Sequence, residues 1–400
     1  MSLTQLIASS PMDAFLYGDP AQSSFKKVFS STMPYAVEMM RMDFSAYSVP
    51  GRGTLIVPRK GDMLMGIYLQ VEMQRDTATD DFFPIENLIE TIQLEIGGQI
   101  IEKYDNNWIR ARNSMLIGNT EKDAVYTMEN FETTDPNTMI RSLWIQLPFW
   151  FNTTSKALPL LALQYHEVRL EFTFANPANI PGVNPSFTPT ITAWGSYAFL
   201  SKQERLMFTK NPHAYVFEQT QTQNFPSIIS TTRSAGTQYT LPFNLPVKYL
   251  LWFFRNPEDF GIYTGDGIGL SANDNAAPLQ SAKIQVNGVD RFDTQIGSYF
   301  RLVEPYRTIQ ISPPAGMYAY YFATNPLEKD TVSGTLNFSA VDTVKLIVTT
   351  KTASAPDLGN VYNEQTTIVN SANLNTLTVI ARSLNILRVE AGMAGIMFQN

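Results

Sequence analysis

The sequence predicts an all-β protein made of two consecutive eight-stranded jelly-roll β-sandwiches, with a few short helices and long loops. Short strand-like segments occur along most of the 400 residues, and 24 Pro and 22 Gly are spread among them as turn residues. Several strand-and-turn patterns also occur twice. A chain of this length suits two domains of about 200 residues each better than one ordinary core.

The strand signals of the first half begin with two apolar segments, residues 55–57 and 67–73, on either side of a polar loop at 59–62. Residues 92–96 alternate apolar and polar side chains and end at Gly97-Gly98. A glycine pair after an alternating segment is typical of a two-residue hairpin turn. We therefore expect a hairpin there.

Further strands are predicted in the middle and the second half of the chain. We interpret residues 147–151 and 157–172 as two strands of a packed sheet joined by a turn. Strand character also marks residues 335–339, 345–349 and 376–381.

Two short helices are predicted, over residues 108–116 and 201–208. Ser201 is the expected N-cap of the second helix, with Glu204 at the spacing of a capping box. Asn211-Pro212 ends this helix, and the join between the domains is expected nearby, at residues 200–212.

The chain repeats its pattern in order. Residues 91–98 resemble 282–288, 190 positions later, and Leu170 corresponds to Leu346, 176 positions later. Leu55 and Leu64 have predicted counterparts 186 positions later, at Leu241 and Leu250. These pairings predict two copies of one fold, with a first jelly roll at residues 21–205 and a second at 206–400, after an N-terminal extension at 1–20.

Long loops are predicted at residues 76–84, 176–189 and 261–278. The last is rich in Gly, Asp and Asn. Such segments are expected to project from one end of a sandwich, outside its core.

Composition narrows the function classes. The net charge is −7, and no run of Lys or Arg exceeds two residues, so we expect no direct contact with nucleic acid. The absence of cysteine excludes disulfides and thiolate metal sites and suits a reducing compartment. We expect neither a signal peptide nor a membrane span, since the longest apolar runs, such as residues 249–254, have strand length.

The sequence predicts no catalytic, cofactor-binding or metal-binding residue and no cofactor. His166 and His213 are the only histidines, without the HExxH spacing of a zinc site, and we expect each to be bonded within the fold. The glycines of residues 265–269 do not match a nucleotide-binding loop. Asp259, Asp266 and Asp274 do not match a calcium loop, so all are interpreted as a solvated segment.

Other candidate residues also have a structural interpretation. Asp80-Asp81 are adjacent, so they are unlike the opposed carboxylates of glycosidases. We expect the aromatic side chains of Trp144, Phe149, Trp150 and Phe151 to pack in a core or an interface, although they would also be able to stack on sugars. Asn152 and Asn337 are glycosylation sequons by pattern only.

The chain resembles the major capsid proteins of large icosahedral DNA viruses, of the iridovirus and phycodnavirus type. The resemblance covers roughly residues 13–400 in order, with a modest departure near residues 331–342. The matching stretches include "EIGGQII" and "LPFWF" with "ALPLLALQYHEV" in the first half, then "NGVDRF", "SGTLNFS" and "GMAG" in the second; they lie at residues 95–101, 147–168, 287–292, 333–339 and 392–395.

This resemblance implies a non-catalytic shell subunit with a double jelly roll. Members of the family form homotrimers whose six barrels make a pseudo-hexagonal capsomer, which tiles an icosahedral shell around a large DNA genome, usually over an inner membrane. The implied partners are neighbouring capsomers and minor capsid and penton proteins, with inner-membrane contact near the N-terminal segment. The implied location is the virion, assembled in the host cytoplasm.

Two alternatives stay open at this point. One is a minor capsid or scaffold protein of the same fold, which copy number in particles would distinguish. The other is a secreted double-jelly-roll enzyme or lectin that acts on glycans. The second needs a carboxylate cluster in a cleft.

Overall fold

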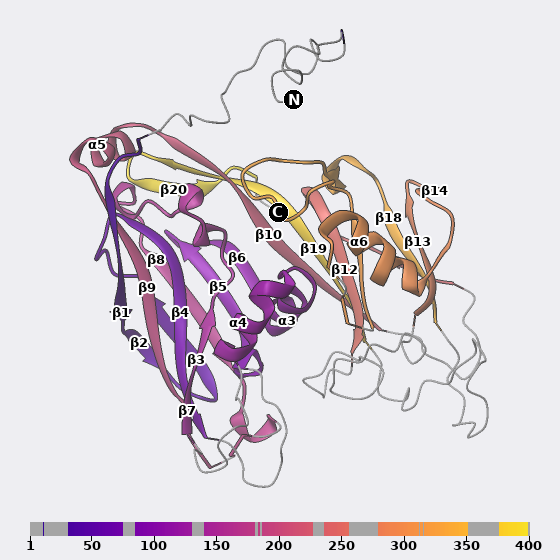
Figure 1. Cartoon of the computed structure of the whole chain (residues 1–400), viewed down its shortest axis with the longest axis horizontal. Helices are drawn as coiled ribbons and strands as arrows, with labels where there is room; N and C mark the ends of the chain where they lie inside the picture. Colours follow the sequence, from indigo (N-terminus) through magenta and orange to yellow (C-terminus); the bar gives the residue numbers. More distant parts are fainter. Residues whose placement is uncertain are drawn as a thin grey trace, which may run out of the picture. The chain divides into compact units, whose positions relative to one another are not determined.

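The computed structural model describes residue 11 and residues 31–74, 85–129, 140–180, 183–184, 186–226, 236–255, 279–311, 313–314, 316–350 and 376–398. Its strands form four antiparallel sheets, two in each half of the chain (Figure 1). The protein is a double jelly roll, as predicted.

The first sandwich consists of a four-stranded and a five-stranded sheet. The four-stranded sheet has the order β1 (Tyr35–Met42), β9 (Thr190–Leu200), β4 (Met63–Gln74) and β7 (Ile140–Gln146). The five-stranded sheet has the order β2 (Phe44–Tyr47), β3 (Gly51–Ile56), β8 (Val168–Phe174), β5 (Ile89–Ile96) and β6 (Gln99–Asp105).

The second sandwich repeats this arrangement. One sheet has the order β10 (His213–Pro226), β19 (Thr376–Glu390), β12 (Pro246–Arg255) and β16 (Met317–Tyr321), with β17 (Leu336–Asn337) and β20 (Met393–Ile396) at its sides. The other has the order β11 (Thr237–Thr240), β18 (Val344–Thr350), β13 (Leu279–Val286) and β14 (Val289–Asp290), with β15 (Gln295–Ile296) beside β13. In Figure 1 the long strands β10 and β19 run together across the molecule.

The strand registers support two of the predicted internal pairings. Leu170 of β8 lies opposite Leu94 of β5, and Leu346 of β18 lies opposite Ile284 of β13. The offsets of 190 and 176 positions therefore join residues at equivalent places. The Leu64 pairing is shifted, because a bulge follows Leu64 in β4 and Val247 in β12, which makes Val247 its counterpart.

Helices occupy the connections between sheets. In the first sandwich α3 (Asn106–Met115) and α4 (Asn119–Glu129) lie between β6 and β7. In the second, the π-helix η7 (Tyr299–Val303) and α6 (Glu304–Ile309) lie between β15 and β16. Between the sandwiches lies α5 (Lys202–Lys210), where the Ser201 hydroxyl accepts a hydrogen bond from Glu204 N, as expected of the predicted N-cap. No helix in the described ranges is long and apolar enough to cross a membrane.

The segment at residues 147–163 differs from the prediction of two strands. It contains the 3₁₀ helices η2 (Trp150–Asn152), η3 (Thr154–Lys156) and η4 (Leu160–Ala162), and the strand begins only at Val168. Pro148 and Pro159 lack the N–H group that a ladder requires. The apolar side chains of this segment are buried without a ladder, and Leu158 makes a single bridge to Leu64.

The predicted strand at residues 335–339 is also shorter than expected. Only Leu336–Asn337 pairs in a sheet, and the 3₁₀ helix η8 (Phe338–Ala340) follows. The Asn337 side chain accepts a hydrogen bond from Ser339 N at 3.0 Å, which turns the chain out of the sheet. Two other short 3₁₀ helices are η1 (Ile85–Leu88) and η5 (Pro177–Asn179); the latter lies in the predicted loop at 176–189. The predicted loops at 76–84 and 261–278 lie outside the described residues.

The two sandwiches share one buried face. In β12, Leu250, Trp252 and Phe254 point into the core of the second sandwich. The alternate residues Leu251 and Phe253 belong to the core of the first sandwich, which extends to this face of β12. A strand buried on both faces explains the unbroken apolar run at residues 249–254. The second sandwich is therefore packed directly against the first.

Candidate functional site: the junction between the two sandwiches

Arg382 lies at the centre of a buried polar cluster that joins the sandwiches. Its guanidinium donates a hydrogen bond to Glu102 Oε1 at 2.6 Å and another to Glu218 Oε2 at 3.1 Å. Glu102 lies on β6 of the first sandwich, and Glu218 and Arg382 lie on β10 and β19 of the second. The Arg382–Glu102 ion pair is therefore a direct link between the two halves. Thr220 contacts both partners of this pair.

Lys248 completes the cluster at the bulge of β12. Its ammonium donates to Glu218 Oε1 at 2.5 Å and to the backbone oxygen of Glu328 at 3.0 Å. The Lys248 side chain is only 2% exposed. Two cations thus face two carboxylates, and this balance is what makes buried charges tolerable.

The two carboxylates respond differently to burial. Burial raises the pKa of Glu102, and the attraction of Arg382 only partly opposes this. Burial also acts to raise the pKa of Glu218, but Arg382 and Lys248 together outweigh it and hold that pKa below its usual value. Glu218 therefore stays ionised because it has two cationic partners.

Aromatic rings from the first sandwich cover the cluster. The Arg382 guanidinium lies over the Trp108 ring, 4.8 Å from its centroid. The Asp105 carboxylate caps α3 by accepting a hydrogen bond from Trp108 N at 3.0 Å, which fixes the start of this helix. Trp150 meets Phe217 of β10 at a centroid distance of 4.8 Å. These contacts cover part of the cluster.

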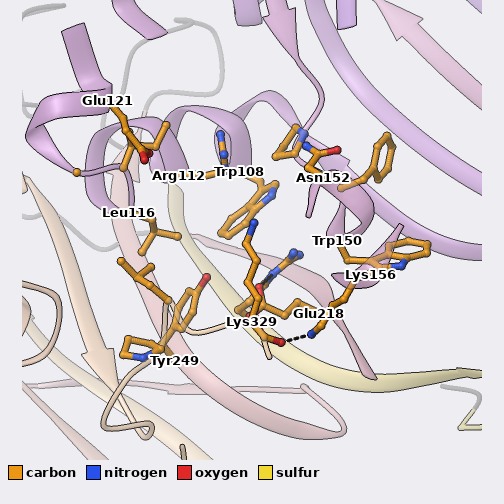
Figure 2. A pocket seen from close by; sticks show the side chains of 17 residues that line it. Trp108, Arg112, Leu116, Glu121, Trp150, Asn152, Lys156, Glu218, Tyr249 and Lys329 are labelled. Carbon is orange, nitrogen blue, oxygen red and sulfur yellow. Dashed lines mark hydrogen bonds and ion pairs between the residues drawn. The ribbon is translucent and has the colours of Figure 1, made fainter. Parts of the chain in front are cut away.

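A cavity of about 430 Å³ opens beside the cluster. Figure 2 shows side chains from both sandwiches gathered around it, and a hydrogen bond from Lys156 to the backbone of Lys329 crosses from one half to the other. Its charged lining comprises Arg112, Glu121, Lys156, Glu218, Lys329 and Arg382. Four cations thus face two carboxylates.

The C-terminal hairpin of β19 and β20 makes a second connection. Tyr165 N donates to the Gly392 oxygen at 2.9 Å, and Ile396 N donates to Gln99 Oε1 at 3.1 Å. His166 Nδ1 lies 3.1 Å from Ala394 N and 3.0 Å from Ala394 O. The hairpin, part of the second sandwich, is thereby hydrogen-bonded to the first.

Comparison with known proteins identifies the family. Two family models match consecutive parts of the chain: "Major capsid protein N-terminus" over residues 23–201 and "Large eukaryotic DNA virus major capsid protein" over residues 204–395. The major capsid protein of Paramecium bursaria Chlorella virus 1 is 35% identical, and the alignment covers 100% of this chain and 99% of that protein. The chain belongs to the major capsid protein family of large eukaryotic DNA viruses.

Other members and solved capsid structures support this assignment. The major capsid protein of Pyramimonas orientalis virus is 28% identical over 100% of this chain and 99% of its own length. A subunit of the PBCV-1 capsid superimposes with a TM-score of 0.87 at 33% identity, covering 94% of this chain and all of the other. The Faustovirus major capsid protein, at 10% identity and a TM-score of 0.69, shares the fold; it covers 97% of this chain and 96% of its own.

In this capsid-family chain, each histidine has a contact within the fold. His166 holds the C-terminal hairpin, and His213 Nε2 lies 2.9 Å from the Phe208 oxygen at the end of α5. Within the described ranges, no three His, Cys, Asp or Glu side chains are grouped as a metal site would require. Both histidines lie beside the C-terminal hairpin, because His213 is opposite Val389 in the sheet and Val389 is opposite Ala394, which His166 contacts.

Several other candidate residues lie outside the described residues. These are Asp80-Asp81, Asp259, Asp266, Asp274 and the glycines at 265–269. Their interpretation as solvated loop residues stays a prediction.

The aromatic candidates are placed in packing contacts. Phe149, Trp150 and Phe151 are buried in the core, and half-buried Trp144 lies on β7 with its ring 5.9 Å from that of Trp194. For Phe149, Trp150 and Phe151 the structure confirms packing in a core, one of the two packing roles expected. Only Trp144 lies in a strand, unlike the strand-like runs expected for all four.

The two sequons differ in their surroundings. The Asn152 amide donates to the Leu147 oxygen at 2.7 Å and lines the cavity. Asn337 is exposed, and its side chain caps η8.

The charged cluster was not predicted from the sequence. Glu102 and Arg382 are separated by 280 positions, and neither belongs to a recognisable motif. A weak signal was present, because each directly follows apolar residues in a strand: Glu102 follows Ile100-Ile101, and Arg382 follows Val379-Ile380-Ala381. Charges at such positions need buried partners.

Proposed function

We propose that this chain is the major shell subunit of a large DNA virus and that it forms a homotrimeric, pseudo-hexagonal capsomer. The observation that carries the proposal is the duplicated strand order of two sandwiches within one chain. Three such chains around a threefold axis place six similar barrels in a ring. One gene product then covers a hexagonal lattice.

The junction supports a building role. A tile must keep its two barrels in a fixed relation, and the shared core of β12 and the Arg382–Glu102 pair bind them together. Catalysis is not part of the proposal.

Exposed apolar side chains supply surfaces for contacts between subunits. Tyr165, Tyr306, Val289 and Ile296 are each more than 60% exposed in the single chain. Neighbouring exposed apolar residues mark contact sites, and Val289 and Ile296 lie on β14 and β15, which both pair with β13. We assign these surfaces to contacts within the trimer and with neighbouring capsomers, minor capsid proteins and penton proteins.

The remaining parts of the proposal concern domains and location. We propose an N-terminal extension at residues 1–20 that contacts minor proteins or an inner membrane, and jelly rolls at 21–205 and 206–400. The family-model matches at 23–201 and 204–395 support these boundaries. The net charge of −7 supports a shell that encloses DNA without binding it. Assembly of the virion in the host cytoplasm is a further part of the proposal.

Mass photometry of the purified protein tests the assembly. We expect a trimer as the dominant species, and hexagonal particles in negative-stain images. A monodisperse monomer at micromolar concentration would contradict the proposal.

A further inference from the structure

Three cationic side chains that line the cavity at the junction have no ion-pair partner in the Arg382 cluster. Arg112 comes from α3 and Lys156 from η3, both in the first sandwich, whereas Lys329 comes from the loop before β17 in the second. Among the described residues, no carboxylate lies within 4.0 Å of the charged nitrogens of these three side chains.

These three side chains have more hydrogen-bond donors than the acceptors around them satisfy. Arg112 donates to the Asn113 side chain at 3.2 Å, and the Lys156 ammonium donates to the Lys329 backbone oxygen. No hydrogen bond is formed by the Lys329 ammonium in the described structure. The cavity therefore has unused donors on both sides.

The nearby carboxylates have other hydrogen-bond partners. Glu129 attracts Arg112 without an ion-pair contact and accepts a hydrogen bond from the Asn113 amide at 2.7 Å. Glu218 is held by Lys248 and Arg382, and Glu328 accepts from the backbone nitrogens of Lys329 and Asp330 at 3.1 and 3.2 Å. Asp330 accepts from the Ser155 hydroxyl at 2.7 Å. Glu121, the other carboxylate of the lining, is exposed at the rim.

The attraction of nearby carboxylates does not offset desolvation at the cavity. Desolvation lowers the pKa of Lys156 and of Lys329 although Glu218 attracts both, and Arg112 and Arg382 lower that of Lys329 further. An anion in the cavity would reverse this effect, because it favours the charged form of each amine.

We propose that the cavity binds a small multivalent anion of the phosphate class, held by Arg112, Lys156 and Lys329. Its volume of about 430 Å³ exceeds what one phosphate group needs and lies in the range of small-ligand sites. Trp108, Trp150 and Tyr249 give part of the wall an aromatic character, which suits an anion that carries a planar group. The ligand class is therefore a di- or triphosphate, free or attached to a nucleoside.

Such a ligand bridges the two sandwiches. Because its donors come from both halves, binding stabilises the packed arrangement over any state in which the halves separate. This inference is independent of the proposed function, since it concerns a single chain and holds whether or not the chain forms trimers.

Calorimetric titration of the purified full-length protein with sodium pyrophosphate tests the inference. EDTA is present throughout, and sodium chloride at matched ionic strength serves as the reference. Pyrophosphate is expected to bind and to raise the thermal unfolding midpoint, whereas chloride does neither. A parallel titration with ATP separates the two forms of ligand: tighter binding than pyrophosphate assigns a nucleotide, and equal binding assigns an inorganic polyphosphate.

Lys329→Gln locates the site. Lys329 is exposed as a whole residue, and its ammonium forms no hydrogen bond in the described structure, so the variant is expected to fold normally. Loss of one charge-assisted contact weakens pyrophosphate binding about tenfold or more. Lys202→Gln, the same charge change on α5 far from the lining, leaves it unchanged. The proposal is overturned if the wild-type protein gives no binding beyond the chloride reference, or if both variants bind alike. Lys156→Gln, expected to weaken binding as well, provides a second test.

Discussion

The two sandwiches share one strand order but carry different chemistry at equivalent positions. In the first sandwich the bulge of β4 contains Met65, which packs against a small apolar cluster. In the second, the bulge of β12 contains Lys248, a buried partner of Glu218. A jelly roll of this kind therefore tolerates either residue at its bulge.

The neighbouring strands show the same contrast. Ser196 of β9 lies opposite Gly66, whereas Arg382 of β19 lies opposite Tyr249 at the matching place. The first sandwich keeps this register without a charge, so the charges of the second are not needed to form the fold. They occur where the second sandwich meets the first, which assigns them to the junction.

Arg382→Met gives the largest effect expected from this comparison. The variant leaves Glu102 buried without its cation and removes one of two partners of Glu218. Breaking a buried pair in this way costs about 3–5 kcal/mol. Denaturant titration of the purified protein measures the loss.

Arg388→Met is the matched control. Arg388 lies on the same strand, and its side chain is 55% exposed in a pair with Glu390. Surface pairs of this kind contribute about 0–1 kcal/mol. Equal costs for the two variants would show that Arg382 has no special role at the junction.

Lys248→Met makes the second bulge resemble the first. The change leaves Glu218 with Arg382 as its one charged partner, and we expect a cost of about 1.5–3 kcal/mol, as for a lost hydrogen bond to a charged group. In a Glu218→Gln background the same change is expected to cost less, because the two side chains are coupled. Lys283→Met, which breaks a half-exposed pair with Asp290, is the control and is expected to cost less than about 1 kcal/mol. If the free-energy costs of Lys248→Met and Glu218→Gln simply add in the double variant, the two side chains are not coupled and the ion pair does not explain the cost.

The contrast between local and long-range signals also explains what the sequence was able to predict. The Gly97-Gly98 turn, the helix capped by Ser201 and the alternating strands depend on residues close together in the chain, and all three are confirmed. The segment at 147–163 was misassigned because its apolar residues are buried without a ladder. The ion pairs of the junction join strands far apart in sequence, and no local pattern specifies their partners.

Gly288→Val tests whether the hairpin turns of the two sandwiches are equivalent. Asn287 and Gly288 both have positive φ, 49° and 81°, and connect paired Val286 and Val289, as in a type I′ turn. A β-branched residue at that φ is strained, and we expect a loss of about 1–3 kcal/mol.

Gly98→Val, at the equivalent place of the first sandwich, is the comparison. Gly98 has the same φ of 81°, and at neither glycine would an added Cβ meet an atom within 4 Å. Backbone strain alone then sets both costs, so thermal unfolding should show similar shifts. A large difference, or unchanged stability and trimer yield for Gly288→Val, would exclude equivalent turns.

The smallest expected effect concerns pH and separates the two carboxylates that share Arg382. The folded pKa of Glu218 lies below its ordinary value of 4.5, so its stabilising contribution is present above that value and is lost as the pH falls through the folded pKa. Glu218→Gln is therefore expected to be less stable than the wild-type protein at pH 7 and to approach it under acid conditions. For Glu102, whose folded pKa is raised, the sign is opposite, because protonation relieves the cost of a buried charge as the pH falls. Unfolding midpoints of the two glutamine variants between pH 7 and pH 3 measure this difference, with exposed Glu390→Gln as the control. Parallel pH profiles for all three would show that the cluster does not distinguish its carboxylates.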